Sequence, residues 1–155
     1  GQVPVIVGVG ALRTDTAVSL ARHAQDSGAD ALLVAPISYT PLTGDEVFAH
    51  YAAIAEASDL PICIYNNPTT THFTFSTGLL ARLAAVPSIR AVKMPLPGDG
   101  DVAGEIADLP VSVALLANTD GSSHELRFQV SDLAEPDSRV STPSTFVAPI
   151  AALRQ

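Results

Sequence analysis

Two stretches decide the fold of this chain: Pro61-Ile62-Cys63-Ile64-Tyr65 and Ile89-Arg90-Ala91-Val92-Lys93. Each is short and largely apolar, and each ends on a side chain that can take part in chemistry, a tyrosine or a lysine. Runs that are apolar on both faces, rather than alternating, are typical of parallel strands buried on both sides. We therefore expect two parallel strands that carry Tyr65 and Lys93 at their carboxyl ends.

The same kind of run occurs three more times, at residues 3–9, 31–35 and 111–116. The first four runs start 28, 30 and 28 residues apart. Such regular spacing is typical of a repeated strand–helix unit. The sequence therefore predicts an α/β fold, either a closed (β/α)₈ barrel or an open doubly wound sheet.

Amphipathic segments with helix start and stop signals separate these runs. Residues 14–27 carry apolar side chains at helical spacing, and a glycine follows them. Thr43 and Glu46 have the spacing of a capping box, and Tyr51 belongs to the apolar stripe that follows. Ser76 is a suitable cap for a third helix. These helices would connect and cover the parallel strands.

The carboxyl-terminal part of the chain has a different character. Residues 118–155 have scattered apolar side chains and frequent Ser, Asp and Pro. We expect one domain over residues 1–117 and a divergent tail of uncertain structure over residues 118–155, with a short helix over residues 146–154. A complete barrel takes about 250 residues, so the 155 residues here supply only about five β/α units.

Composition excludes several classes of function. The net charge of −8 argues against nucleic acid or an anionic membrane surface as a partner. Cys63 is the only cysteine, which suits a reducing cytoplasm. The four histidines show no metal-ligand spacing, and we expect His23 and His50 on helix surfaces and no metal site.

Lys93 is the only lysine in the chain and ends an otherwise apolar strand. A lysine in that place can simply extend to solvent. However, β/α proteins build their active sites at the carboxyl ends of parallel strands, and an amine shielded from water is a better nucleophile. Tyr65 ends the preceding strand, and its phenol could pass protons between the amine and a bound carbonyl compound.

Several ordered motifs resemble the dihydrodipicolinate synthase/N-acetylneuraminate lyase family. Residues 61–68 are similar to its tyrosine strand, residues 89–93 to the strand of its reactive lysine, and the 28-residue separation of Tyr65 and Lys93 matches as well. Further similar stretches are residues 4–10, 30–36 and 48–55. The resemblance covers roughly residues 1 to 97.

This resemblance implies a fold of the (β/α)₈ TIM-barrel type, present here as a partial barrel, and class I aldolase chemistry. Lys93 would form a Schiff base with pyruvate or a related 2-oxo acid, and Tyr65 would act as the proton relay. An aldehyde would be the second substrate or a product. The resemblance further implies that no cofactor or metal is needed and that the protein forms a homo-oligomer.

The chain departs from the family pattern at several positions. The family's carboxylate-binding Gly-Thr-Thr-Gly-Glu motif does not occur in this chain, and Met94 replaces the acidic residue that usually follows the lysine. We expect Thr70 and Tyr39 to take part in substrate binding. Thr70 stands where one branch of the family carries an arginine, which disfavours a second substrate with an exposed dicarboxylate. Ile37 and Ser38, next to Tyr39, replace the family's tyrosine pair.

Two other interpretations stay open at this point. The chain could be a catalytically inactive remnant of a barrel that serves as an interaction or structural module. Alternatively, Gly8 and Gly10 resemble half of a dinucleotide-binding fingerprint, although the third glycine is absent. We interpret these two glycines as a tight turn from strand to helix.

Overall fold

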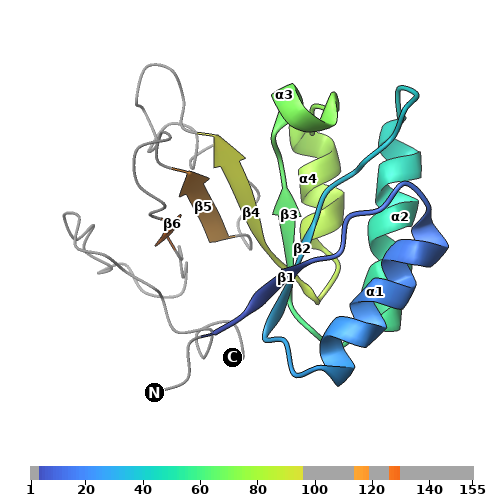
Figure 1. Ribbon diagram of the computed structural model, residues 1–155. Coiled ribbons are helices and arrows are strands. Elements are labelled where there is room, and N and C mark those ends of the chain that lie inside the picture. Colours follow the sequence, from blue (N-terminus) through green and yellow to red (C-terminus); the bar gives the residue numbers. More distant parts are fainter. Residues whose placement is uncertain (1–3, 96–113, 119–125, 130–155) are drawn as a thin grey trace.

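The computed structural model describes residues 4–95, 114–118 and 126–129. Its strands form one sheet in the order β1-β2-β3-β4-β5-β6 (Figure 1). The strands are β1 (Ile6–Gly8), β2 (Ala31–Val34), β3 (Ile62–Tyr65), β4 (Ile89–Pro95), β5 (Ala114–Asn118) and β6 (Leu126–Gln129). The helices are α1 (Thr14–Asp26), α2 (Gly44–Ala57), α3 (Pro68–Thr71) and α4 (Thr77–Ala84). Each of the five strands predicted from the sequence has a counterpart.

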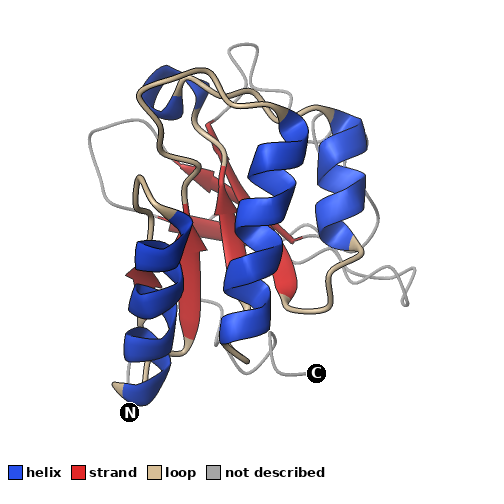
Figure 2. Cartoon of the chain, turned by 90° about the vertical axis from the view of Figure 1, so that its right-hand side faces the viewer, coloured by secondary structure: helices blue, strands red, loops and turns tan. Residues whose placement is uncertain are grey.

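Strands β1 to β5 are parallel and follow one another in sequence order. The long helices α1, α2 and α4 lie on one face of the sheet, on the right in Figure 1 and in front of the strands in Figure 2. A doubly wound sheet would reverse its strand order and cover both faces with helices. Sequential order with helices on a single face is instead the arrangement of part of a (β/α)₈ barrel, as the sequence predicts.

The helix starts follow the predicted caps. The Thr43 hydroxyl accepts a hydrogen bond from the Glu46 backbone N–H at 3.3 Å, and the Glu46 carboxylate accepts one from the Thr43 N–H at 2.7 Å. This reciprocal pair is a capping box at the start of α2. Ser76 accepts from the N–H of Leu79 at 3.2 Å and so caps α4.

The two faces of the sheet bury different side chains. The outward face packs against the helices in the main core, with fully buried side chains such as Leu32, Ile64 and Val92. The inward face carries a separate small cluster in which Cys63 and Ala91 pack with Leu33. Because both faces hold apolar residues, the strands read as continuous apolar runs rather than alternating ones.

The ladder between β3 and β4 contains a register shift. Ile62 pairs with Ile89, but Cys63 pairs with Ala91, so Arg90 is an extra residue in β4. Ile89 and Val92 both lie in the outward core although they are three positions apart, whereas Ala91 faces inward. Since side chains alternate along a regular strand, Ile89 and Val92 can face the same side of the sheet only because the bulge at Arg90 inserts one residue.

One strand was not foreseen in the sequence. β6 lies within the predicted tail and pairs with β5 in antiparallel orientation, so the sheet departs here from the all-parallel order of a barrel. The predicted helix over residues 146–154 lies outside the described residues, as do residues 111–113 of the fifth predicted strand. The proposed domain boundary after residue 117 stays a prediction.

The two histidines predicted on helix surfaces differ in their surroundings. His23 is exposed on α1, as predicted. His50 is half-buried, its Nδ1 lies 2.9 Å from the Thr14 hydroxyl of α1, and burial lowers its pKa. The surface prediction for His50 is therefore wrong, because the α1–α2 contact covers that side of α2.

Within the described residues no helix is long and apolar enough to cross a membrane.

The capping box yields a stability prediction. Replacing Thr43 by Ala should lower the free energy of unfolding by about 1 kcal/mol, because the first turn of α2 loses a hydrogen-bond acceptor. Urea unfolding followed by circular dichroism measures this difference. Thr74→Ala, at an exposed threonine before α4, is the matched control and should change stability by less than about 0.5 kcal/mol. Equal stabilities of the Thr43 variant and the parent would contradict the capping role.

Candidate active site

Tyr65 and Lys93 lie side by side at the carboxyl ends of β3 and β4. They are direct partners in the parallel ladder, and the Lys93 Nζ lies over the tyrosine ring, 4.9 Å from its centroid. Both side chains are half-buried. By alternation from Cys63 and Ala91, both belong to the inward face of the sheet. The structure thus brings together the two residues that the sequence singles out for chemistry.

Two asparagines after Tyr65 hold this pair in place. The backbone N–H of Asn66 donates to the Lys93 carbonyl at 2.9 Å, which extends the β3–β4 ladder past the tyrosine. The side-chain amide of Asn67 donates to the Tyr65 hydroxyl oxygen at 3.3 Å. Because that oxygen acts as an acceptor, the phenol proton stays available for a second partner. The contact between Asn67 and the phenol was not foreseen from the sequence.

Cys63 lies below the pair on the same inward face. Its side chain is buried, and burial raises the pKa of the thiol to about 12, although the Lys93 backbone and amine act in the opposite direction. The thiol is therefore neutral at physiological pH. Together with Ala91 and Leu33 it forms an apolar floor beneath the lysine.

The other two predicted site residues are not part of this cluster. Tyr39, in the loop after β2, has a side chain that is 93% exposed. Thr70 is exposed on α3, where its backbone N–H donates to the Asn67 carbonyl at 3.0 Å. Both lie in connections that leave the carboxyl ends of strands, at the upper edge of the sheet in Figure 1. Their assignment to substrate binding stays a prediction.

Gly10 has a packing role that explains its identity. A Cβ atom at Gly10 would lie 3.1 Å from the Ile37 side chain and 3.4 Å from that of Ala35. The loops that follow β1 and β2 therefore approach each other closely at Gly10. Gly8 is the last residue of β1, and a Cβ atom there would have no neighbour within 4 Å. Neither glycine has a positive φ, so the tight-turn interpretation of the pair stays a prediction. In the part of the chain that the structure describes, no group of three or more His, Cys, Asp or Glu side chains could hold a metal ion.

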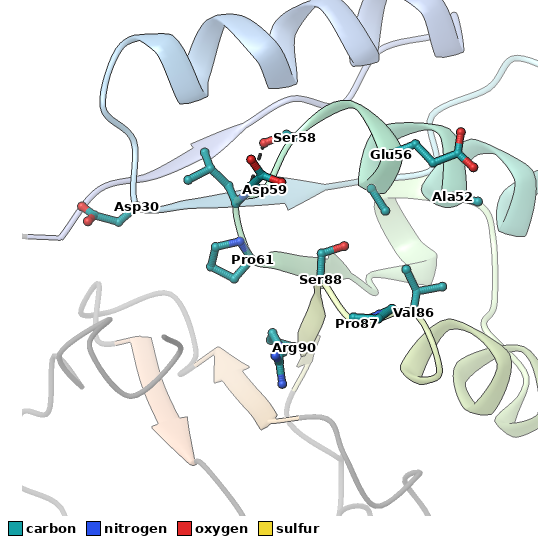
Figure 3. Close-up of a pocket in the computed structure, with 12 residues that line it drawn as sticks. Asp30, Ala52, Glu56, Ser58, Asp59, Pro61, Val86, Pro87, Ser88 and Arg90 are labelled. Atoms are coloured by element: carbon teal, nitrogen blue, oxygen red, sulfur yellow. Dashed lines mark hydrogen bonds between the residues drawn. The ribbon is translucent and has the colours of Figure 1, made fainter. Parts of the chain in front are cut away.

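A hollow of about 740 Å³ lies at the opposite end of the strands. Figure 3 shows its polar lining, which includes Asp30, Asp59 and Arg90. These residues precede or begin β2, β3 and β4, whereas Lys93 and Tyr65 stand at the other ends of β4 and β3. None of the four predicted site residues lines this hollow. It is therefore separate from the candidate active site.

Comparison with known proteins agrees with this geometry. The sequence profile of the dihydrodipicolinate synthetase family matches residues 1–106. The chain belongs to this family. A 4-hydroxy-tetrahydrodipicolinate synthase of Sphingopyxis alaskensis is 41% identical over 111 residues, which are 72% of this chain and 36% of that protein. The synthase of Agrobacterium fabrum is 55% identical over 67 residues, which are 43% of this chain and 23% of that protein.

Solved structures give the same result for the fold. A crystal structure of dihydrodipicolinate synthase from Agrobacterium tumefaciens superposes with a TM-score of 0.70 at 57% sequence identity. That match covers 74% of this chain and 40% of the other. A family member thus shares the fold of this chain over the matched part. The chain spans about a third of the length of the curated relatives it matches.

The buried thiol can be tested directly. With a pKa of about 12, Cys63 should react only slowly with a disulfide reagent at pH 8 in the folded protein and rapidly in urea, because the reactive thiolate is disfavoured by burial. Absorbance of the released thiolate measures both rates. Rapid reaction of the folded protein would show that water and reagent reach the Cys63 thiol on the inward face of the sheet.

Proposed function

We propose that the chain carries the reactive centre of a Schiff-base lyase or aldolase that acts on pyruvate or a related 2-oxo acid and an aldehyde. Lys93 is the nucleophile in this proposal, and Tyr65 is the proton relay. The observation that carries it is the placement of the chain's only lysine amine 4.9 Å from the Tyr65 ring centroid at the carboxyl edge of the sheet. The names of the relatives support it, since they are synthases of one family.

The proposed reaction uses the groups of this site in a definite order. The neutral Lys93 amine attacks the ketone carbon, the resulting carbinolamine loses water, and an iminium ion forms. Loss of a proton from the adjacent methyl group gives an enamine, which adds to the aldehyde carbon. Hydrolysis of the product iminium then restores the amine. Tyr65 can carry protons to and from the carbinolamine oxygen because its own oxygen already accepts a hydrogen bond from Asn67.

The remaining sequence predictions belong to the same proposal. Tyr39 and Thr70 would take part in substrate binding, and the neutral side chain of Thr70 disfavours a second substrate with an exposed dicarboxylate. Among the described residues, the inward face beneath Lys93 is formed by the apolar cluster of Cys63, Ala91 and Leu33. We also infer that the protein forms homo-oligomers and works in the cytoplasm, where the lone thiol stays reduced.

Trapping with borohydride tests this function. Incubation with pyruvate and borohydride should add the mass of the reduced pyruvate adduct to the peptide that contains Lys93, because borohydride converts the imine into a stable amine. Peptide mass spectrometry locates the adduct. Lys93→Arg keeps the positive charge and should abolish the adduct at that peptide.

The chain itself offers a sharp control for this experiment. Since Lys93 is the only lysine, the remaining primary amine in the Arg variant is the amino terminus, which reports non-specific reaction. Tyr65→Phe should still form the adduct, but about a hundredfold more slowly, because it lacks only the proton relay. A folded parent protein that forms no adduct at Lys93 would favour the alternative of a catalytically inactive structural or interaction module.

A further inference from the structure

The buried tyrosine Tyr51 reaches from α2 to the end of the β2–β3 ladder. Its side chain is 0% exposed, and its hydroxyl donates to the Val34 carbonyl at 2.6 Å. Its ring packs edge-to-face against Phe75, with ring centroids 6.1 Å apart. A phenol held this rigidly fixes the last carbonyl of β2 from the outward face of the sheet.

The ladder directs the backbone of Tyr65 to that same carbonyl. Val34 pairs with Ile64, and the Leu32 N–H donates to the Pro61 carbonyl at 2.9 Å. In a parallel ladder with this hydrogen-bond pattern, the Val34 N–H donates to the Cys63 carbonyl, and the Tyr65 N–H donates to the Val34 carbonyl. The Val34 carbonyl therefore accepts from both the Tyr51 hydroxyl and the Tyr65 N–H, which is the last hydrogen bond of the β2–β3 ladder.

The interaction with Tyr65 also acts on the phenol of Tyr51. Burial and the nearby Cys63 raise the pKa of Tyr51 well above its usual value, and a hydrogen bond with the Tyr65 backbone acts in the opposite direction. The hydroxyl thus stays protonated and remains a donor to Val34. The neutral hydroxyl of Tyr51 thus links the end of β2 to the end of β3 at Tyr65. Tyr65 is in turn the partner of Lys93 in the β3–β4 ladder.

We propose that Tyr51 is a positioning residue that holds the backbone of Tyr65 from outside the barrel and so sets its phenol against the Lys93 amine. This inference rests on the proposed role of Tyr65. Tyr51 touches no reacting atom. Without its hydroxyl, the end of β3 keeps its strand neighbours but loses the anchor that fixes the direction of the Tyr65 side chain.

Tyr51→Phe is the decisive variant, because it keeps the ring and its packing on Phe75 and removes only the hydroxyl. With pyruvate and borohydride, the variant should form the Lys93 adduct about tenfold more slowly, with the half-saturating pyruvate concentration unchanged. Ile54→Val, also buried on α2, is the matched control and should react at the parental rate. The double variant Tyr51→Phe/Tyr65→Phe should be no slower than Tyr65→Phe alone, because Tyr51 acts only through Tyr65.

A second measurement keeps this inference separate from the proposed function. Hydrogen exchange of the Tyr65 backbone amide, followed by NMR, should be at least about tenfold faster in Tyr51→Phe than in Ile54→Val. Parental amide exchange in Tyr51→Phe, or additive losses of rate in the double variant, would overturn the positioning role. If the parent protein forms no adduct, the proposed function fails by itself, and amide exchange alone then decides whether Tyr51 anchors Tyr65.

Discussion

The extra residue at Arg90 in β4 is the constraint on which the candidate site depends. A strand turns alternate side chains to opposite faces, so one inserted residue moves every later side chain to the other face. Ile89 faces the helices, and without the bulge Lys93, four positions further on, would face them too. With the bulge, Ala91 turns inward and Lys93 follows it to the edge of the inward face. Bulges are common next to active sites for this reason.

Two layers of packing make that geometry specific. The outward core of the helices fixes the strands against sliding, because a slip of one residue would turn Leu32, Ile64 and Val92 away from it. On the inward face, the buried neutral thiol of Cys63 leaves no charge directly under the amine. The amine lies over the Tyr65 ring, whose hydroxyl accepts a hydrogen bond from Asn67. The protein supplies position and local polarity, and the proposed chemistry belongs to the lysine and its substrate.

Local sequence signals predicted most of the fold because each depends on nearby residues. The apolar runs gave the five parallel strands, and Thr43, Glu46 and Ser76 marked the helix starts that the structure contains. The strand–helix repeat alone left the barrel and the doubly wound sheet open, because the choice depends on which face the helices cover, and only the family resemblance favoured the barrel. Strand β6 was missed because its pairing partner is β5, and scattered apolar residues do not encode that contact.

The site was predicted in part for similar reasons. The spacing of Tyr65 and Lys93 follows from the repeat, whereas the bulge has only one local sign, a charged Arg90 inside an apolar run. Tyr51 fits an apolar helical stripe as well as a phenylalanine would, so the partner of its hydroxyl could not be read from the pattern. Tyr39 and Thr70 came from motif positions, and both are exposed in the structure, Tyr39 in the loop after β2 and Thr70 on α3.

The direction of the Lys93 side chain is the most direct test of this account. Labelling lysine with ¹³C at the ε carbon gives one side-chain signal, since the chain has a single lysine. The account predicts nuclear Overhauser contacts from the Lys93 ε protons to the ring protons of Tyr65, with the ε signal displaced by the ring current. Contacts from the same protons to Ile89 or to the leucines of α4 would place the amine on the outward face and contradict the account.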